Sequence, residues 1–331
     1  MCRARAAGVP GRIEEDSHRH HKLQVTKDGD EWMKATVAVC THNRAEDTRE
    51  AVQSVLDGSY RGDDLEIIVV DNGSTDATPE VIGALCDRHG SRVRYAYEQR
   101  LGLSVARNRA IREARGDYIL FLDDDALASR EWVEEILHVF ESDNSIGCVG
   151  GRIDPIWEAG EPAWIPDEHR SVFTILDFAD SITEMEAPAI PYGANVAFRT
   201  SALMEGQLFR EDLGRVGSKL LSSEESELIA RLRRKHKVVY TPHGSVRHKI
   251  AKTRTTRKWF LRRIFWQGVS DAVKRGDRSA WAMAKHIIRM LQAIMATLPA
   301  VFRPKAFIRQ VSNICYRNGT LVGIVRYGGK G

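Results

Sequence analysis

Residues 118–126, with the sequence YILFLDDDA, constrain the fold of this chain more than any other segment. The apolar run over residues 118–122 is typical of a strand buried in a parallel sheet. Three carboxylates, Asp123, Asp124 and Asp125, follow it directly. Because side chains alternate along an extended backbone, we expect Asp123 and Asp125 to face one way and Asp124 the other. Open α/β sheets bind ligands beyond the carboxyl ends of their strands, so the segment predicts an acidic ligand site there.

Neighbouring carboxylates of this kind indicate a divalent cation as cofactor. Their mutual repulsion is relieved by water, by protons or by a cation. Mg²⁺ or Mn²⁺ is usually held by one or two carboxylates while substrate phosphates complete its shell. The alternative is a solvated acidic turn before the next helix, because Ser129 and Glu131 are typical of an N-cap and a first helical turn.

Charge is unevenly distributed along the chain, although the net charge of the 331 residues is only +4. Between Lys252 and Arg289 there are eleven Lys or Arg residues, and only Asp271 and Asp277 oppose them. Such a local excess suits a membrane surface, an anionic acceptor or nucleic acid. Nucleic acid is not an expected partner, because no known nucleic-acid-binding module accompanies the charge.

The five cysteines and the hydropathy of the chain indicate a compartment. The cysteines are scattered and form no CxxC or Cys/His metal spacing, which fits a reducing cytosol. The N-terminus lacks the apolar core of a signal peptide. The longest apolar candidate for a membrane span, residues 280–302, is interrupted by Lys285, His286 and Arg289. We therefore expect a cytoplasmic protein, either free or peripheral on the inner face of the cell membrane.

The pattern of apolar residues divides the chain into three parts. Residues 1–34 are polar and aperiodic, which predicts a flexible N-terminal extension. Over residues 35–145 strands alternate with helices, which predicts an α/β fold with a mainly parallel, Rossmann-like sheet flanked by helices. From residue 146 the rhythm changes, and residues 251–331 are basic, aromatic and helical by pattern. The expected strands are residues 36–40, 65–70, 93–98, 118–122, 149–153, 191–198, 238–240 and 246–250, and the expected helices include residues 78–90, 102–115 and 222–234.

Seven segments, taken together and in order, resemble the inverting, family 2 glycosyltransferases of the GT-A fold. They are TVAVCTHNR, IIVVDNGSTD, GLSVARNRAI, FLDDDA, GANVAFR, SSEESEL and VRH. The resemblance covers about residues 36–275. It implies a GT-A catalytic domain over residues 35–250, with a nucleotide-binding half up to residue 145, a donor-sugar and acceptor half after it, and a C-terminal helical appendage.

The resemblance also implies roles for individual residues. Asp125, Asp123 and His248 correspond to the metal site. Glu224 and Glu225 correspond to the pair that supplies the catalytic base, although the family has Asp at the second position and this chain has Glu225. The residues implied in nucleotide and donor binding are Thr41, Asn43, Arg44, Asp71, Asn72, Ser74, Gly102, Arg107, Asn108, Asp123, Asp124, Gly193 and Asn195.

The reaction implied by the resemblance is metal-dependent transfer of a hexosyl group, with inversion, from a nucleotide-diphosphate sugar to an acceptor hydroxyl. A UDP-sugar is the favoured donor and Mg²⁺ or Mn²⁺ the cofactor. The acceptor is a saccharide, a lipid-linked intermediate or a small molecule, as in polysaccharide, glycolipid or secondary-metabolite glycosylation. Residues 252–307 either pack as core helices or contact a membrane peripherally.

Other functional classes agree less well with the sequence. A dinucleotide-dependent oxidoreductase would need GxGxxG after the first strand, and no glycine lies between Gly29 and Gly58. No phosphate-loop motif GxxxxGK[ST] occurs. The remaining alternatives are a nucleotidyltransferase, which would need a basic phosphate-binding loop near the first strand, and a non-catalytic nucleotide-sugar-binding protein.

Overall fold

A computed structural model of the chain describes residues 33–206, 208–215, 220–276 and 279–326. A flexible extension is predicted for residues 1–34, and residues 1–32 of it lie outside the described residues. Met33 and Lys34 belong instead to the first strand, β1, where Met33 is buried.

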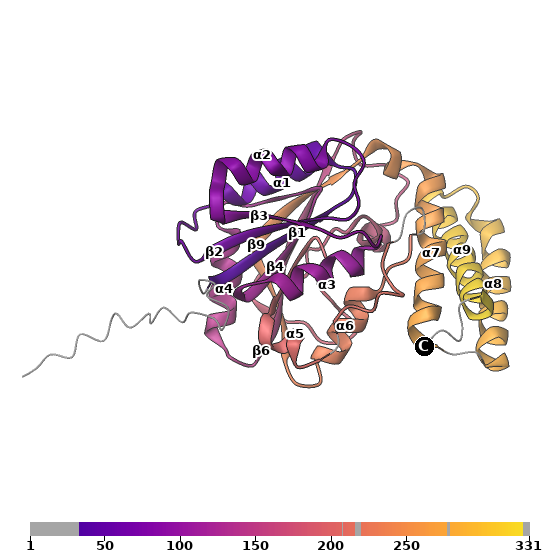
Figure 1. Ribbon diagram of the computed structural model, residues 1–331. Helices are drawn as coiled ribbons and strands as arrows, with labels where there is room; N and C mark the ends of the chain where they lie inside the picture. The colour runs from indigo at the N-terminus through magenta and orange to yellow at the C-terminus, as the bar shows by residue number, and fades with distance from the viewer. Residues whose placement is uncertain (1–32, 207, 216–219, 277–278, 327–331) are drawn as a thin grey trace, which may run out of the picture. The chain divides into compact units, whose positions relative to one another are not determined.

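Four parallel strands form the amino-terminal half of the sheet in the order β3–β2–β1–β4. Thr41 pairs with Asp71 and Cys40 with Asp123, so the carboxyl ends of these strands meet at one edge. Helices α1 and α2 lie on one face of this half and α3 on the other (Figure 1). The bounds are β1 Met33–Thr41, α1 Ala45–Leu56, β2 Leu65–Asp71, α2 Thr78–His89, β3 Val93–Tyr97, α3 Leu103–Glu113 and β4 Gly116–Asp123.

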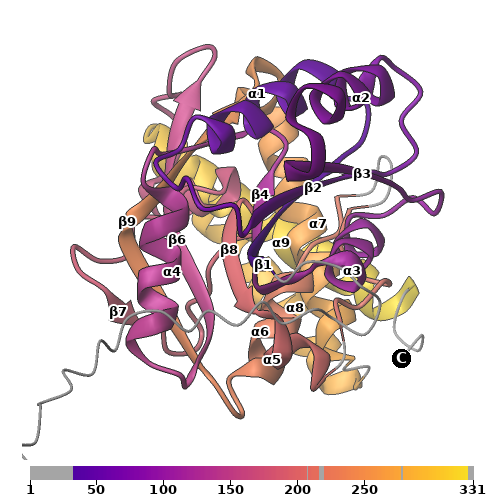
Figure 2. The same cartoon turned by 60° about the vertical axis from the view of Figure 1, so that its left-hand side comes forward.

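The second half extends the same sheet in the order β4–β8–β6–β9–β5, with β7 paired to β9 (Figure 2). Strand β8 runs antiparallel to both β4 and β6, whereas β6 and β9 are parallel. The predicted α/β class with a mainly parallel sheet flanked by helices is confirmed. The bounds are β5 Ala126–Ala128, α4 Trp132–Ser142, β6 Ile146–Trp157, β7 Thr183–Glu184, β8 Asn195–Arg199, α5 Thr200–Met204, α6 Glu224–Leu232 and β9 Lys237–Ile250.

Several boundaries differ from the sequence-based expectation; the strand expected over residues 191–198, for example, is β8, Asn195–Arg199. Two of the differences have a physical reason in the packing. The strands expected at residues 238–240 and 246–250 are one strand, β9, because pairing with β6 continues past the turn-like Pro242 and Gly244 through an irregularity in register. The helix expected over residues 102–115 ends at Glu113, and Gly116, expected to close it, begins β4. Glycine is needed there for close approach, since a β-carbon on Gly116 would overlap the backbone of Ala35.

Ser129 and Glu131 do not form the helix cap that their residue types indicate. The N-cap of α4 is Glu131, and its side chain makes no capping hydrogen bond. The acidic segment is therefore not simply the capped start of the next helix, because the short strand β5 lies between them.

Three helices follow the sheet: α7 Arg257–Arg275, α8 Ala280–Ala300 and α9 Pro304–Arg326. Phe260 and Ile264 of α7 are buried in a second apolar core together with Ile308 of α9. Helices α7 and α9 lie so close together at Gly268 that a β-carbon on this residue would overlap the carbonyl of Tyr316. Over the described residues, no helix has both the length and the apolar composition needed to cross a bilayer.

The close approach of α7 and α9 predicts opposite effects for two helical glycines. Gly268→Ala should lower the free energy of unfolding by about 1–3 kcal/mol, because the added methyl group pushes the helices apart. Gly83→Ala, in α2, is the matched control, since no described atom lies within 4 Å of the added carbon. It should raise the free energy of unfolding by about 0.5–1 kcal/mol. Chemical denaturation measures both, and equal effects would contradict the packing.

Candidate active site

A cavity of about 900 Å³ lies at the carboxyl ends of β1 and β4. A cavity of this size is typical of sites for nucleotide-sized ligands. Its wall is formed by the ends of these strands, the start of α3, the start of α6, and the C-terminal helices α7 and α9. Both predicted acidic groups, residues 123–125 and residues 224–225, line it. The structure therefore brings together the carboxylates that the sequence separates by about a hundred residues.

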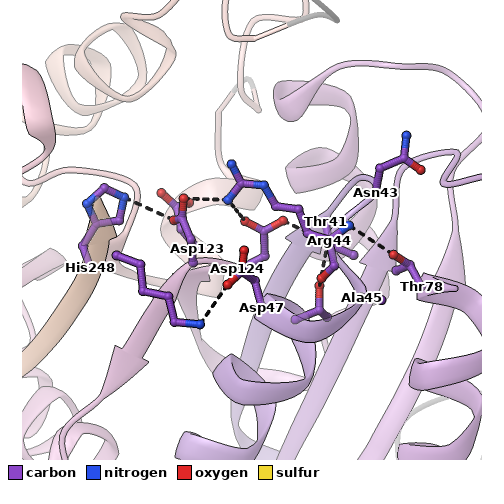
Figure 3. Close-up of polar contacts among 12 residues, drawn as sticks. Thr41, Asn43, Arg44, Ala45, Asp47, Thr78, Asp123, Asp124 and His248 are labelled. Atoms are coloured by element: carbon purple, nitrogen blue, oxygen red, sulfur yellow. Dashed lines mark hydrogen bonds and ion pairs between the residues drawn. The ribbon is translucent and has the colours of Figure 1, made fainter. Parts of the chain in front are cut away.

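The three aspartates after β4 turn to different partners. Asp123, the last residue of the strand, accepts a hydrogen bond from Arg107 Nη2 at 3.3 Å. Asp124 accepts from Thr41 Oγ1 at 2.9 Å and from Arg44 Nη1 at 3.1 Å. The expectation that Asp123 and Asp125 face the same way is wrong, because the extended backbone ends at Asp123 and a turn follows. Figure 3 shows Arg44 extended toward Asp124, beside Thr41.

Asp125 is the most strongly compensated of the three aspartates. Its Oδ2 accepts from Arg44 Nη1 at 2.6 Å and from Arg254 Nη2 at 3.1 Å. His248 reaches in from β9 (Figure 3). Its Nε2 lies 3.2 Å from Asp125 Oδ1. Burial raises the pKa of Asp125, but His248 and the two guanidinium groups outweigh burial and hold that pKa well below its usual range. Burial raises the pKa of Asp124 to about 7, with Arg44 opposing the shift.

The donor set at Asp125 fits a divalent cation that takes few protein ligands. Adjacent ligand atoms around octahedral Mg²⁺ lie about 3 Å apart, which agrees with the spacing of Asp125 Oδ1 and His248 Nε2. Ligation by Nε2 would leave the proton on Nδ1, and that atom is buried without a partner among the described residues. Asp125 is thus the stronger ligand candidate. In the described part of the chain, no three His, Cys, Asp or Glu side chains cluster as a metal site.

Glu224 and Glu225 occupy the first turn of α6, and Arg107 lies between them and β4. Arg107 Nη1 donates to Glu225 Oε1 at 2.8 Å and to Glu224 Oε1 at 3.3 Å. The Arg107 side chain is only 3% exposed. A β-carbon on Gly193 would overlap both the guanidinium of Arg107 and the carboxylate of Glu225. Glycine at position 193 therefore permits the contact between Arg107 and Glu225.

The two glutamates differ in protonation. Burial and the neighbouring charge of Glu225 raise the pKa of Glu224 to about 8. Burial also acts to raise the pKa of Glu225, but the Arg107 guanidinium and a backbone hydrogen bond outweigh it and lower that pKa. At neutral pH the pair therefore carries one proton, on Glu224, and one negative charge, on Glu225.

Several residues predicted to contact the nucleotide form hydrogen bonds with neighbouring loop residues. Asp71 is fully buried and accepts from the backbone N–H of Ser74 at 2.9 Å and from Tyr95 Oη at 2.9 Å. Asn43 Oδ1 accepts from the backbone N–H of Thr75 at 2.7 Å, and its own N–H donates to Ser74 Oγ. Their predicted nucleotide contacts stay predictions.

Three polar side chains farther along the chain are engaged in the same way. Asn72 lines the cavity, and its Oδ1 accepts from the N–H of Gly102 at 2.8 Å. Asn108 bonds the backbone of Phe209. Asn195 is fully buried, accepts from Trp132 Nε1 at 2.9 Å and donates to two backbone carbonyls. Of the predicted binding residues, those on the cavity wall are Thr41, Arg44, Asn72, Gly102, Arg107, Asp123, Asp124 and Gly193.

The sequence analysis missed the part of the cavity wall that the C-terminal helices supply. Arg254 binds Asp125, and Gln267 and Asp271 of α7 hydrogen bond to Ser223 at the start of α6. Tyr316 of α9 donates to Asp271 at 2.6 Å. The basic and aromatic residues over 252–307 indicate helices in this part of the chain. Their spacing along the sequence does not show which face of each helix lies against the cavity. The residues of this wall are Arg254, Trp259, Arg263, Ile264, Gln267, Asp271, Lys274, Ser312, Asn313, Tyr316 and Arg317.

Known proteins share this sequence pattern. The family model described as "Glycosyl transferase family 2" matches residues 36–206, slightly more than half of the chain. The chain is 29% identical over 245 residues to a glucosyl-dolichyl phosphate glucuronosyltransferase of Haloferax volcanii, covering 73% of this chain and 77% of that protein. It is 28% identical over 253 residues to a pre-mycofactocin glycosyltransferase of Mycobacterium tuberculosis. That match covers 74% of this chain and about half, 49%, of the mycobacterial protein.

Solved structures share the fold at low sequence identity. A mannosyltransferase from Pyrobaculum calidifontis in complex with GDP-Man and Mn²⁺ superposes with a TM-score of 0.58 at 20% identity, covering 87% of each chain. Residues 1–349 of TarS from S. aureus, in complex with UDP, give a TM-score of 0.52 at 16% identity. That superposition covers 88% of this chain and 91% of TarS.

The raised pKa of Glu224 predicts how stability depends on pH. The unfolded chain releases this proton near the ordinary value of 4.5, whereas the folded protein keeps it up to about 8. The stabilising contribution of the protonated form is therefore complete below pH 4.5 and is lost as the pH rises toward 8, by at most about 1.4 kcal/mol per pH unit. Glu224→Gln removes this titration, so the variant does not share the loss of stability with rising pH. The free energy of unfolding of the variant minus that of the wild type should therefore increase between about pH 5 and pH 8.

Chemical denaturation across that pH range measures the difference. A difference that stays constant with pH would contradict the assignment of the shared proton to the buried Glu224.

Proposed function

The chain belongs to glycosyl transferase family 2, and from that membership and the site we propose that this glycosyltransferase moves a hexosyl group, with inversion, from a nucleotide-diphosphate sugar to an acceptor hydroxyl. One observation carries the proposal. A single guanidinium, that of Arg107, bonds both Asp123 at the end of β4 and Glu225 at the start of α6. It thereby fixes a carboxylate base relative to the strand end where ligands of such sheets bind.

In the proposed reaction, Glu225 accepts the proton of the acceptor hydroxyl. The acceptor oxygen forms a bond to the anomeric carbon as the bond from that carbon to the diphosphate breaks, and the diphosphate leaves with the electron pair. The lowered pKa of Glu225 keeps it ionised at neutral pH, while Glu224 holds its proton and does not compete for the acceptor. Arg107 orients the base but also lowers its proton affinity.

Positive charge near the aspartates suits the leaving diphosphate. Arg44 and Arg254 both line the cavity beside Asp125. A divalent cation, Mg²⁺ or Mn²⁺, held by Asp125 with His248 and Asp123 as further ligand candidates, would neutralise charge on the phosphate oxygens. The Mn²⁺ in the complex of the Pyrobaculum calidifontis mannosyltransferase supports metal dependence.

The proposal also covers the donor nucleotide and the acceptor. We favour a UDP-sugar; TarS was crystallised with UDP, but the mannosyltransferase was crystallised with GDP-Man. The Haloferax volcanii relative is named for a glucosyl-dolichyl phosphate, which supports a lipid-linked saccharide over a free saccharide or small molecule as acceptor. Thermal shifts with UDP, GDP and dTDP, followed by a screen for nucleoside diphosphate release from their sugars, test both the donor and the activity.

We place the protein in the cytoplasm, peripheral to the inner face of the cell membrane. The described cysteines Cys40, Cys86, Cys148 and Cys315 are all free thiols, which agrees with a reducing compartment. The basic segment 252–307 is the part of the chain that was expected to contact the membrane.

The assignment of Glu225 as base predicts a selective loss of turnover. Glu225→Gln should lower kcat at least about a hundredfold and leave the Kd of the donor nucleotide within about threefold. Glu227→Gln is the matched control, because Glu227 lies in the same helix turn but pairs with Arg231. Steady-state kinetics and calorimetry separate the two effects. Equal losses of turnover and binding would indicate a structural role, and unchanged turnover would favour a non-catalytic protein.

The assignment of Asp125 predicts metal-dependent activity. Chelation should abolish turnover, and Mg²⁺ or Mn²⁺ should restore it. Asp125→Asn should remove this restoration, lowering kcat by at least about a hundredfold, because the carboxylate that holds the cation is lost. His248→Gln should lower it less, since Asp125 remains. Full turnover in the presence of chelator would exclude the metal, and equal losses in both variants would contradict the ranking of the two ligands.

A further inference from the structure

Helix α8 carries a row of large apolar side chains that face solvent. Trp281, Ile288, Leu291, Met295 and Leu298 recur at helical spacing on one face, and Phe302 continues the row beyond the helix. The exposed fractions range from 53% for Ile288 and Leu291 to 93% for Phe302. Single exposed apolar residues are ordinary, but a continuous row of them marks a contact surface. We call these six residues the α8 stripe.

The opposite face of α8 is already packed against the protein. His286 and Ala293 are buried, and Arg317 Nη1 of α9 lies 3.2 Å from His286 Nδ1. Phe260 and Ile264 of α7 are buried as well, and Trp259, Leu261, Phe265 and Trp266 are partly buried. Packing as core helices, one of the two alternatives for residues 252–307, therefore accounts for α7 and α9. It does not account for the α8 stripe, which stays exposed. Figure 1 shows α8 on the outer side of the three helices.

The segment that carries the stripe holds charge of one sign only, and the acids Asp167 and Glu168 that approach it are paired with its Lys305 and Arg309. From Arg278 to the end of the chain the sequence holds nine Lys or Arg residues and neither Asp nor Glu. Lys285 and Arg289 are exposed at the border between the stripe and the packed face of α8, and the exposed Arg303 follows the helix. An apolar face bordered by cations is the pattern of a helix that lies in the interface of an anionic membrane.

We propose that the α8 stripe docks on an anionic phospholipid bilayer. The apolar side chains enter the boundary between headgroups and acyl chains, and Lys285, Arg289 and Arg303 contact lipid phosphates. A second copy of the chain is a poorer occupant. A two-fold contact through α8 would bring the cations of both copies together, and this segment has no acid to compensate them.

Docking through α8 places the cavity beside the lipid surface. Tyr316 and Arg317 of α9 line the cavity, and Arg317 also contacts α8. One helix therefore separates the cavity from the stripe. Binding to lipid requires neither donor nor base, so the docking and the proposed reaction can fail independently.

Vesicle flotation with the full chain tests the proposal. The probes are vesicles of phosphatidylcholine alone and of equal parts phosphatidylcholine and phosphatidylglycerol, without donor or metal. Binding is expected to the mixed vesicles. Changing Leu291, Met295 and Leu298 together to Ser should weaken it at least about a thousandfold, because three large apolar side chains no longer transfer from water into the bilayer. Lys285→Gln with Arg289→Gln should weaken it roughly thirtyfold, from about 1 kcal/mol per cation.

The matched control is Met204→Ser, on α5, which replaces another exposed methionine and should leave lipid binding unchanged. Light scattering of the same proteins reports association between copies. Failure of the wild type to float with the mixed vesicles, or flotation of the triple Ser variant equal to that of the wild type, would overturn the proposal. A dimer of the wild type that the triple Ser variant dissociates, without lipid binding, would assign the stripe to a second copy.

Discussion

The site depends on the ion-pair network of Arg107. Its guanidinium is almost fully buried and bonds Asp123, Glu224 and Glu225, which come from two different elements. A buried cation is tolerated only when its charge is matched and its hydrogen bonds are used, and this network does both. The arrangement also requires small neighbours, since any side chain at Gly193 would displace the guanidinium from Glu225. Arg107 therefore joins the strand end and the base into one unit, while the rings of Phe121 and Phe209 pack against it.

The cavity contains two pairs of adjacent carboxylates, Asp124 with Asp125 and Glu224 with Glu225. In both pairs, the pKa of one member is raised and that of the other is lowered. In each pair, neighbouring cationic groups outweigh burial at one member, Asp125 or Glu225, and lower its pKa. The other member, Asp124 or Glu224, is buried beside a charged neighbour and has a raised pKa. Each pair thus holds one secure negative charge and one group that protonates near neutral pH. The secure charge lies where the proposed chemistry needs a ligand for a cation or a base.

Local sequence signals predicted a mainly parallel sheet, most of its strands and the acidic edge, because apolar period and turn residues act over a few positions. These local signals gave wrong boundaries where contacts between distant segments determine the conformation. Strand β9 continues through Pro242 and Gly244 because β6 holds it, and the alternation expected after Asp123 ends with the strand. Arg254 and the cavity faces of α7 and α9 could not be predicted, since no local pattern says which face of a helix meets a distant loop.

Glu225, the proposed base, belongs to a part of the chain that the C-terminal helices hold in place. The family match ends at residue 206, before Glu225. Ser223, just before the base, has φ of 79°, a conformation that costs a non-glycine residue about 1 kcal/mol or more. Contacts from α7 compensate, because Ser270 accepts from the N–H of Ser222, and Gln267 and Asp271 bond Ser223. Since α7 is in turn packed on α9 through Gly268 and Gly319, a change in that helix packing reaches the base through Ser222 and Ser223. The helices beyond the matched region thus complete the cavity wall near Glu225 and position this proposed base.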